Sequence, residues 1–382
     1  MTVKTALPTL AIVVATYACS SSAPATPSAP PAADAATSAE ASTPDAGSVN
    51  PACEALRSQL ASALEAERNA QRAKHAALGV YVAPCGTLAV ASSASGESFT
   101  STPATLFRIA SISKTFLAAT MIQLAQAKKI DLDAPIGTWL PDFPKADVIT
   151  VKMLLNHTSG IPDYLSTQNY RDATKDRSRT PSVDERISWV KNIAFTNEPG
   201  AQWAYSNTNY LIAGRIIDKA TGSGWASQLR TATFEKASLK HTFVFGEEPI
   251  QEAIAPGPDA HELEWIGADG AVVTTPADLV AWAKALYLDK TVLDPAGFSL
   301  MTTTVPMQKG AGYGLGFTRL DPSLTGGVGP MLGHNGAVLG YRAEAWAYPD
   351  KGWVVASFIA KEGSDAQKLT MAAESVLANF TP

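Results

Sequence analysis

The sequence predicts an α/β protein of the α+β type, in which an antiparallel sheet is flanked by helices and a mostly helical lobe is inserted in mid-chain. Three observations indicate this fold. Apolar residues alternate with polar ones near both ends of the chain, as in strands that bury one face. Between about residues 135 and 290 the pattern changes to short helices and loops. A final amphipathic helix closes the chain. This arrangement favours an active site where the sheet meets the lobe.

The length and composition are those of a globular protein. The chain has 382 residues, of which 46% are hydrophobic and 17% are charged, with a formal net charge of -5. This length suffices for one large domain or two smaller ones. The slight acidity and the lack of basic clusters give no indication of nucleic-acid binding. The histidines lack the spacing of metal ligands, so we expect no metal and no cofactor, and a structural role for His157.

The N-terminal segment is expected to lie outside the fold. Residues 6–15 form an apolar run that is typical of a signal peptide and too short to span a membrane. Thr16-Tyr17-Ala18-Cys19 resembles a bacterial lipobox, which predicts cleavage before Cys19 and lipidation of that cysteine. The alternative is Ser21-Ser22-Ala23, a site for ordinary signal peptidase, although Pro24 follows it directly.

A tether is predicted after the signal peptide (residues 1–19), because residues 20–50 are almost entirely Ala, Ser, Pro and Thr. Such a tether favours a lipoprotein over a freely secreted protein. We therefore expect an exported, periplasmic or cell-envelope protein that meets the membrane only through its lipid anchor. Residues 51–382 form the folded domain, with the helical lobe at roughly 135–290.

Two cysteines remain after either cleavage, namely Cys53 and Cys85, and an exported compartment is oxidising. A predicted helix over Glu54–His75 leads away from Cys53, and a predicted strand over Leu78–Ala83 returns Cys85 towards it. We therefore predict a disulfide, which stabilises the fold by roughly 3–4 kcal/mol in the chain-entropy model. The alternative is a pair of buried free thiols.

Hydrophobic periodicity predicts the helices. The N-terminal half contains a helical run over Phe116–Ala127 and a helical turn over Val151–Leu155. Thr275 and Pro276 form a clear helix start, since threonine caps a helix and proline suits its first position. The remaining helices are predicted over Val183–Asn192, Tyr210–Ala220, Pro276–Tyr287 and Asp365–Leu377.

Alternating apolar residues predict the strands. Leu78–Ala83 and Thr87–Ser92 form a hairpin around the turn Pro84-Cys85-Gly86. Near the C-terminus the chain alternates again, and the turn Pro349–Gly352 joins the last two predicted strands. These C-terminal strands are predicted over Gly312–Leu320, Tyr341–Tyr348 and Trp353–Phe358.

Ser111-Ile-Ser-Lys114 is the first stretch that points to chemistry. It lies where an irregular segment becomes helical, and positions i and i+3 of a helix share a face, so the hydroxyl and the ammonium can meet. Serine is a poor nucleophile without an adjacent base, and a desolvated lysine is one such base. If Ser111 opens the helix, the free N–H groups there favour a developing anion.

Tyr205-Ser-Asn207 is the second such stretch, and it immediately precedes a predicted helix. A phenol beside a lysine ammonium can be held partly ionised and act as a proton shuttle. The carboxamide of Asn207 can bind a substrate amide, because it both donates and accepts hydrogen bonds. Alone, this pair is more often turn chemistry.

Gly333-His334-Asn335-Gly336-Ala337 is the third stretch, and it leads into the strand near Tyr341. Glycines at an edge strand let the backbone of a substrate approach closely. The N–H groups of Ala337 and Ser111 could together form an oxyanion hole. Alone, His-Asn-Gly is more often a hairpin turn.

In the order Ser-x-x-Lys, Tyr-x-Asn and His-x-Gly, the three stretches resemble the serine beta-lactamase-like family. This family includes class C beta-lactamases, serine D-Ala-D-Ala carboxypeptidases and related esterases. The resemblance extends from about Cys53 to the end of the chain. Three connecting stretches fit it as well: Leu154-Leu-Asn-His-Thr-Ser-Gly160, Tyr313-Gly-Leu-Gly316 and Gly267-Ala-Asp-Gly270.

The resemblance implies a role for each site residue. Ser111 is the acylated nucleophile and Lys114 is its activator. Tyr205 is the general base and the acid for the leaving group. Asn207 binds substrate, and Trp265 lines the substrate pocket.

The third stretch departs from the class C pattern. His334-Asn335-Gly336 replaces Lys-Thr-Gly, which is more similar to the carboxypeptidase branch, and Ala337 follows as a substrate-binding position. A histidine with an ordinary pKa near 6.5 is mostly neutral at pH 7. Some relatives carry an arginine for the substrate carboxylate on the preceding strand. Here that position is Thr318, and Arg319 beside it faces the opposite side. Recognition of a free carboxylate is therefore an open question.

We expect an exported serine hydrolase that acts through an acyl-enzyme on Ser111, with D-Ala-D-Ala-type peptides as substrates. The alternatives are an esterase or a class C-like beta-lactamase, which would use the same groups on an ester or a beta-lactam. A non-catalytic penicillin-recognising protein is a further alternative, although a binder does not need the pair of Lys114 and Tyr205. The sequence leaves the oligomeric state open.

Overall fold

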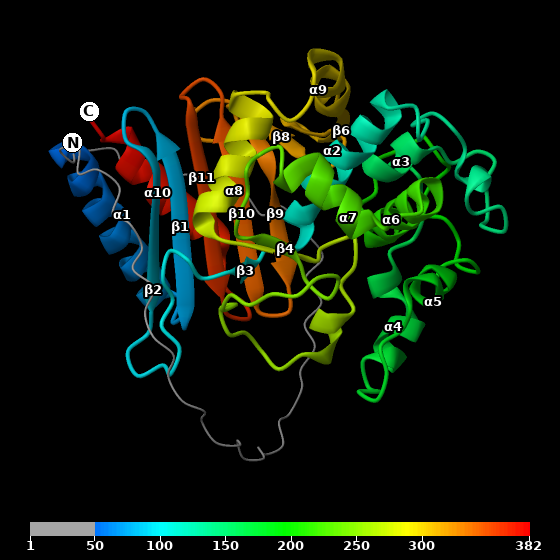
Figure 1. Ribbon diagram of the computed structural model, residues 1–382, viewed down its shortest axis with the longest axis horizontal. Coiled ribbons are helices and arrows are strands. Elements are labelled where there is room, and N and C mark those ends of the chain that lie inside the picture. Colours follow the sequence, from blue (N-terminus) through cyan, green and yellow to red (C-terminus); the bar gives the residue numbers. More distant parts are fainter. Residues whose placement is uncertain (1–49) are drawn as a thin grey trace. The chain divides into compact units, whose positions relative to one another are not determined.

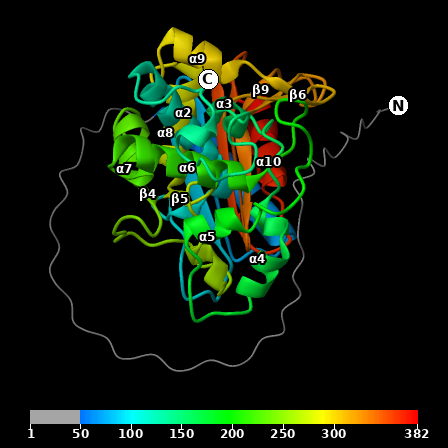
Figure 2. The same ribbon diagram turned by 90° about the vertical axis from the view of Figure 1, so that its right-hand side faces the viewer.

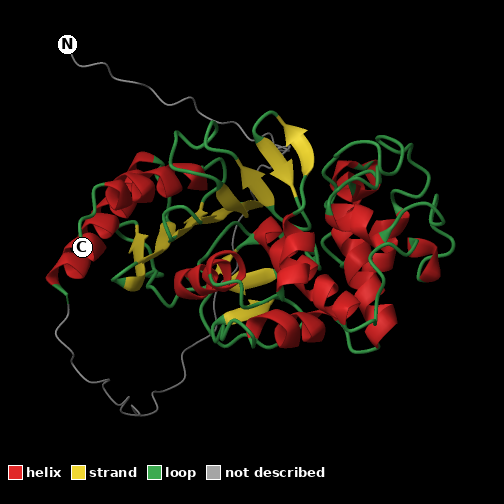
Figure 3. Cartoon of the chain, turned by 90° about the horizontal axis from the view of Figure 1, so that it is seen from above, coloured by secondary structure: helices red, strands yellow, loops and turns green. Residues whose placement is uncertain are grey.

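The computed structural model describes residues 50–382. The predicted signal peptide, Cys19 and nearly all of the predicted tether lie outside the described residues. The folded domain contains an antiparallel sheet between two layers of helices, with a helical lobe beside it (Figures 1 and 3). The predicted fold class is therefore confirmed. Within residues 50–382, no helix is both long enough and apolar enough to cross a membrane.

The main sheet has eight strands in the order β2-β1-β11-β10-β9-β8-β7-β6, and all neighbouring pairs are antiparallel. Strands from the two ends of the chain meet at the β1–β11 pair. A smaller sheet has the order β3-β5-β4. The strands are β1 (His75–Val82), β2 (Gly86–Ser93), β3 (Phe107–Arg108), β4 (Thr242–Val244), β5 (Val272–Thr274), β6 (Val305–Gln308), β7 (Ala311–Tyr313), β8 (Thr318–Leu320), β9 (Met331–Val338), β10 (Tyr341–Tyr348) and β11 (Trp353–Ala360).

The helices cover both faces of the sheet. Helices α1 and α10 pack together on one face, and α8 packs on the other. Helices α3 to α6 belong to the lobe, which faces the viewer in Figure 2. The helices are α1 (Pro51–Ala70), α2 (Ser113–Gln126), α3 (Val151–Leu155), α4 (Gln168–Ala173), α5 (Val183–Ser188), α6 (Asn207–Thr221), α7 (Trp225–Leu229), α8 (Pro276–Ala283), α9 (Pro295–Thr302) and α10 (Ala366–Ala378).

Helix α2 is almost completely buried in the core of the domain. Its Phe116 ring stacks on Trp282 of α8 with the ring centroids 4.0 Å apart. The Trp282 indole N–H donates a hydrogen bond of 2.8 Å to Thr115 Oγ1. An apolar contact and a satisfied buried donor therefore anchor the helix that carries Lys114.

Several predicted boundaries agree with the structure, and the first helix does not. The strand over Tyr341–Tyr348 and the turn over Val151–Leu155 are as predicted. Helix α1 ends at Ala70 rather than at His75, which is the first residue of β1. The chain turns between them because the buried Arg68 guanidinium donates to the Ala73 carbonyl oxygen.

The predicted strand over Gly312–Leu320 is wrong, because this stretch forms the two strands β7 and β8. Gly316 lies between them with a φ of 80°, a conformation that side chains other than glycine rarely adopt. A Cβ atom there would lie 2.5 Å from the Lys114 carbonyl oxygen. The turn therefore lets the β7–β8 hairpin pack directly against α2.

The disulfide between Cys53 and Cys85 is formed, as predicted, with the two Cα atoms 5.4 Å apart. It joins the first turn of α1 to the turn between β1 and β2. The disulfide therefore fixes the start of α1 to the β1–β2 turn, two points that are 32 residues apart in the sequence.

Candidate active site

Ser111 and Lys114 are brought together by a helix start. Ser111 lies in a 3₁₀ turn, Ala110–Ile112, that runs directly into α2. Ala110 just before it has a positive φ of 47°, a strained conformation of the kind that clusters at functional sites. The Lys114 Nζ atom lies 3.1 Å from Ser111 Oγ. Lys114 is fully buried, whereas Ser111 keeps partial exposure.

Lys114 makes three hydrogen bonds from its Nζ atom. The acceptors are Ser111 Oγ, Asn207 Oδ1 at 2.9 Å and the Asp269 carbonyl oxygen at 2.6 Å. An ammonium has three N–H donors, so each has a partner. Burial lowers the pKa of Lys114 to about 8, although the nearby carboxylates of Asp269 and Asp163 oppose the shift. A neutral amine able to accept the Ser111 proton is therefore available near neutral pH.

Tyr205 reaches Ser111 from the other side. It lies two residues before α6, and its phenol oxygen is 2.8 Å from Ser111 Oγ. Burial raises the pKa of Tyr205 far above its ordinary value, and the carboxylates of Asp163 and Asp269 add to the shift. The hypothesis of a partly ionised phenol is therefore wrong for the unliganded protein. Tyr205 is protonated and donates to the nucleophile.

Asp163 is a site residue that the sequence reasoning missed. Its Oδ2 accepts a hydrogen bond of 2.9 Å from Asn207 Nδ2, so the carboxylate orients the carboxamide that contacts Lys114. Burial raises the pKa of Asp163 to about 6, against the hydrogen bonds that it accepts. The available signal was its position directly after the Leu154–Gly160 stretch, separated from it only by Ile161 and Pro162.

Asp269 holds the third acceptor for Lys114 in place. Its buried carboxylate accepts hydrogen bonds of 3.1 Å from the Tyr164 hydroxyl and from the Gly267 N–H. These bonds fix the loop whose carbonyl oxygen faces Lys114. This loop contains the Gly267–Gly270 stretch that fits the family pattern, although the pattern alone predicts no role for Asp269.

His157 lies fully buried beside Tyr205, with the ring centroids 4.3 Å apart. Its Nδ1 accepts hydrogen bonds from the Ser206 N–H at 3.3 Å and from Asn209 Nδ2 at 3.0 Å. These two donors assign the proton to Nε2, which has no hydrogen-bond partner among residues 50–382. Burial lowers the pKa of His157, so the ring is neutral and packs beneath the phenol.

His334 lies on β9, and its Nε2 is 3.0 Å from the hydroxyl of Tyr313. Its ring centroid is 6.3 Å from that of Tyr205. Burial lowers the pKa of His334 to about 3, and the positive charge of Lys114 adds to this effect. His334 is therefore neutral over the whole physiological pH range. A histidine with its ordinary pKa near 6.5 would instead be partly protonated at the lower end of that range.

The β9 segment beyond Gly333 forms a local edge of the sheet. It continues to pair with β10 as far as Val338, whereas β8 pairs with β9 only from Met331 to Gly333. A Cβ atom at Gly336 would lie 2.0 Å from the Ile109 carbonyl oxygen, so the edge passes against the turn that contains Ser111. This close approach is compatible with the predicted oxyanion hole at Ala337.

Asn335 lies on β9 between His334 and Gly336, the two residues that face the region of Ser111. Side chains alternate along a strand, so Asn335 lies on the opposite face from His334 and Gly336. It pairs there with Glu344 of β10, which hydrogen-bonds to α10 through Thr370. Among residues 50–382, no hydrogen bond joins the Asn335 side chain to the groups around Ser111.

Within residues 50–382, the side chains of Trp265 and Arg319 also take no part in the hydrogen bonds around Ser111. The Trp265 ring contacts Tyr170 and His261. Arg319 is exposed and pairs with Asp321 at 3.2 Å, as its predicted outward direction requires.

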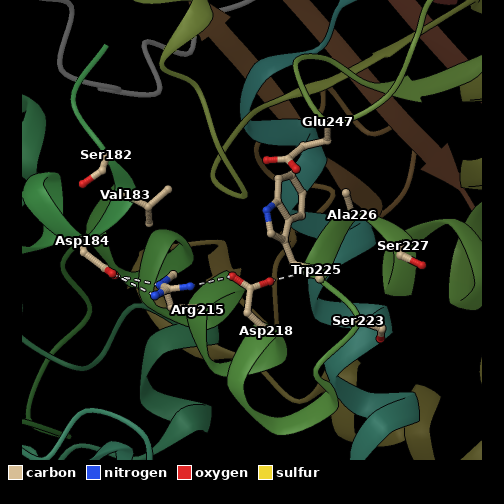
Figure 4. Close-up of a pocket in the computed structure, with 11 residues that line it drawn as sticks. Ser182, Val183, Asp184, Arg215, Asp218, Ser223, Trp225, Ala226, Ser227 and Glu247 are labelled. Carbon is tan, nitrogen blue, oxygen red and sulfur yellow. Dashed lines mark hydrogen bonds and ion pairs between the residues drawn. The ribbon is translucent and has the colours of Figure 1, made fainter. Parts of the chain in front are cut away.

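A separate pocket of about 440 Å³ lies between α5, α6 and α7 (Figure 4). Three of its charged groups are paired with each other: Arg215 contacts Asp184 at 2.7 Å and Asp218 at 3.2 Å. None of its lining residues takes part in the hydrogen bonds around Ser111. The nucleophile, and not this pocket, defines the candidate active site.

Comparison with known proteins agrees with this geometry. The sequence pattern of the Beta-lactamase family matches residues 61–378. The chain belongs to the beta-lactamase family. Family members with this fold are serine hydrolases, and the mixed α/β architecture described above is the family fold.

Three known proteins that are similar to this chain illustrate the range of its relatives. "Penicillin-binding protein 4*" of Bacillus subtilis is 29% identical over 300 residues, which cover 71% of this chain and 65% of that protein. The chain thus spans somewhat less than two thirds of that relative. A D-stereospecific amidohydrolase from a Streptomyces species is 27% identical with a TM-score of 0.71, covering 83% of this chain and 98% of the other. The D-amino acid amidase of Ochrobactrum anthropi SV3 is 25% identical with a TM-score of 0.72, covering 85% and 99%.

Proposed function

We propose that this protein is an exported serine hydrolase that forms an acyl-enzyme on Ser111 and cleaves amide or ester bonds whose acyl group is a D-amino acid. One observation carries the proposal. Ser111 Oγ lies within hydrogen-bond distance of both the Tyr205 phenol and the buried Lys114 amine. A nucleophile between a base and an acid is the arrangement that acyl transfer requires.

In the proposed reaction, neutral Lys114 accepts the proton of Ser111 while Oγ attacks the substrate carbonyl carbon. The oxyanion that forms is stabilised by the N–H groups of Ser111 and Ala337. Tyr205 gives its proton to the leaving group, and the Lys114 ammonium restores the protonated phenol. Water then attacks the ester carbonyl, the same groups transfer its proton to Ser111 Oγ, and the D-amino acid is released as the free acid.

The preference for an acyl group of D configuration is supported by the similar proteins, since two of the three are named for D-amino acid or D-stereospecific substrates. The specific D-Ala-D-Ala carboxypeptidase hypothesis requires a group that binds a terminal carboxylate. His334 is neutral, all three donors of Lys114 have partners, and Arg319 is exposed and paired with Asp321. These observations favour leaving groups without a carboxylate.

The test is mass spectrometry of the purified protein with D-alanine 4-nitroanilide, its L enantiomer, N-acetyl-D-Ala-D-Ala and benzylpenicillin. We expect a covalent adduct on Ser111 and faster turnover of the D than of the L anilide. The absence of an adduct with every compound would refute the proposal. Preferential turnover of N-acetyl-D-Ala-D-Ala would instead support the carboxypeptidase hypothesis.

Export through a lipid anchor on Cys19 remains part of the proposal. It rests on the Thr16–Cys19 stretch and on the Ala-, Ser- and Pro-rich residues that follow. Membrane fractionation and mass spectrometry of the mature N-terminus test it. A soluble product that begins near Pro24 would favour ordinary signal-peptidase cleavage.

A further inference from the structure

The carboxylate of Asp163 is connected to the nucleophile by two side chains. Asp163 Oδ2 accepts from Asn207 Nδ2 at 2.9 Å, and Asn207 Oδ1 accepts from Lys114 Nζ at 2.9 Å. Lys114 in turn contacts Ser111 Oγ. Asp163 Oδ1 accepts from the Leu165 N–H at 3.2 Å, so the carboxylate is held at both oxygens. Its position relative to Ser111 is therefore fixed by hydrogen bonds rather than by a mobile loop.

Asp163 is charged but has no ion-pair partner within 4 Å in the part of the chain that the structure describes. Burial raises its pKa to about 6, so it is mostly ionised at pH 7. An ionised carboxylate has about four lone-pair positions, and Asp163 uses three of them, for the Leu165 N–H, the Asn207 Nδ2 group and the Asn207 backbone N–H. One acceptor position therefore remains without a donor.

Asp269, the other carboxylate beside Lys114, provides a comparison. Its side chain is buried, and its oxygens accept from Tyr164 and from the Gly267 N–H. Asp163 keeps partial exposure as a residue, whereas Asp269 is buried. Of these two residues, Asp163 is the more exposed.

The charges around the nucleophile favour a cationic substrate group. Lys114 has no N–H left for a substrate, because its three donors are taken by Ser111, Asn207 and Asp269. His334 is neutral. A partly desolvated carboxylate without a cation in direct contact is costly, and a bound ammonium relieves that cost.

We propose that Asp163 binds the protonated α-amino group of the substrate's acyl residue, so that the enzyme acts on D-aminoacyl amides and esters with a free amino terminus. This inference rests on the proposed function and narrows its substrate class. An N-acylated residue has no positive charge to offer. It also carries a bulky neutral group at the position where Asp163 requires a cation.

The experiment compares D-alanine 4-nitroanilide with D-lactic acid 4-nitroanilide, which differ only in an ammonium against a hydroxyl group. N-acetyl-D-alanine 4-nitroanilide is the third substrate. The proteins are the full chain, its Asp163→Asn variant and the control Asp172→Asn, which removes an exposed carboxylate from α4. The measured quantity is the ratio of kcat/KM for the alanyl substrate to that for the lactyl substrate, because intrinsic reactivity cancels when this ratio is compared between proteins.

We expect the Asp163→Asn substitution to lower this ratio roughly tenfold to a hundredfold, as the loss of a hydrogen bond to a charged group implies. The Asp172→Asn control should leave the ratio unchanged. The N-acetyl substrate should be poor with the unsubstituted protein and should not worsen further in Asp163→Asn.

Two results would overturn the inference while leaving the proposed function intact. An unchanged ratio in Asp163→Asn would assign the α-amino group to another residue. An equal loss for the alanyl and lactyl substrates would mean that Asp163 only orients Asn207, since asparagine has a single side-chain oxygen for the three donors that now bond to Asp163. Failure of every substrate and of benzylpenicillin to form an adduct on Ser111 would instead refute the proposed function, and the inference with it.

Discussion

Ser111 Oγ and the Tyr205 phenol oxygen lie 2.8 Å apart, although 94 positions separate the two residues in the chain. The bond joins the turn before α2 to the loop before α6, and therefore the sheet region to the helical lobe. Because Tyr205 is protonated, it acts as a donor in the resting state. The base that activates Ser111 must then be Lys114.

Replacement of Ser111 by alanine should abolish hydrolysis, because no second nucleophile lies between Lys114 and Tyr205. We expect kcat/KM to fall by at least about 10³-fold, the scale of losses when a catalytic nucleophile is removed. The control is Ser58→Ala, which changes an exposed serine on α1. Residual turnover within about tenfold of the unsubstituted protein would contradict the acyl-enzyme mechanism.

The pH dependence should report Lys114. Its neutral form is the base, so kcat/KM for D-lactic acid 4-nitroanilide should rise with pH, reach half its maximum at about 8 and level off above. The D-alanyl substrate should show a second, descending limb, because its α-amino group loses its charge at a pKa of roughly 7.7–8.0. Lys114→Arg should remove activity at all pH values, since arginine stays protonated. A lactyl profile without a rise between pH 6 and 9 would exclude Lys114 as the base.

His334 should not act as a pH-dependent carboxylate sensor. Its pKa of about 3 leaves it neutral above pH 5. The ratio of kcat/KM for an ester with an anionic leaving group to that for a neutral one should therefore be constant between pH 5 and 8. A ratio that increases severalfold as the pH falls would restore the hypothesis that protonated His334 binds a carboxylate.

Glu344 should make the fold less stable as the pH rises. Burial raises its pKa from 4.5 to about 7, and its Oε2 accepts from the Trp346 indole and the Thr370 hydroxyl. The folded state therefore binds more protons than the unfolded state between these pH values, and the free energy of unfolding decreases through this range by up to about 3 kcal/mol.

Glu344→Gln keeps an oxygen for both donors and removes the charge. It should be more stable than the unsubstituted protein at pH 8, by roughly 2–3 kcal/mol, and similar to it at pH 4.5. Urea unfolding at the two pH values measures this difference. A variant that is less stable than the parent at pH 8 would show that the carboxylate is needed in its charged form.

Loss of the disulfide should affect stability and not chemistry. The Cys53→Ala, Cys85→Ala double variant should lose roughly 3–4 kcal/mol of unfolding free energy, because the bond closes a loop of 32 residues in the unfolded chain. The active site should keep its kcat/KM, since the bond lies at the α1–hairpin junction. Comparison of urea unfolding and kinetics for the two proteins separates the effects. An equal loss of activity and stability would contradict this assignment.

Some elements could be predicted because their signals are local. Thr275 accepts from the Asp278 N–H, as the cap-and-proline pattern indicated. The strand over Tyr341–Tyr348 follows from alternation alone. The division of Gly312–Leu320 into β7 and β8 could not be predicted, because alternation continues across the turn. That turn is set by the contact of Gly316 with the α2 backbone.

The sequence by itself determined which groups are available for chemistry. Ser111 and Lys114 meet because three-residue spacing on a helix is a local property, and the ordered motifs placed Tyr205 and Asn207 with them. Only the tertiary structure decided the charges of these groups. Lys114 donates a hydrogen bond to the carbonyl oxygen of Asp269, which lies 155 residues away in the sequence. The site that this contact helps to close is buried. Burial lowers the pKa of Lys114 and raises that of Tyr205, which therefore stays protonated. Protonation depends on solvent exclusion and on distances between remote segments, which residue order does not contain. For the same reason Asp163 became visible as a site residue only when the fold brought it to Asn207.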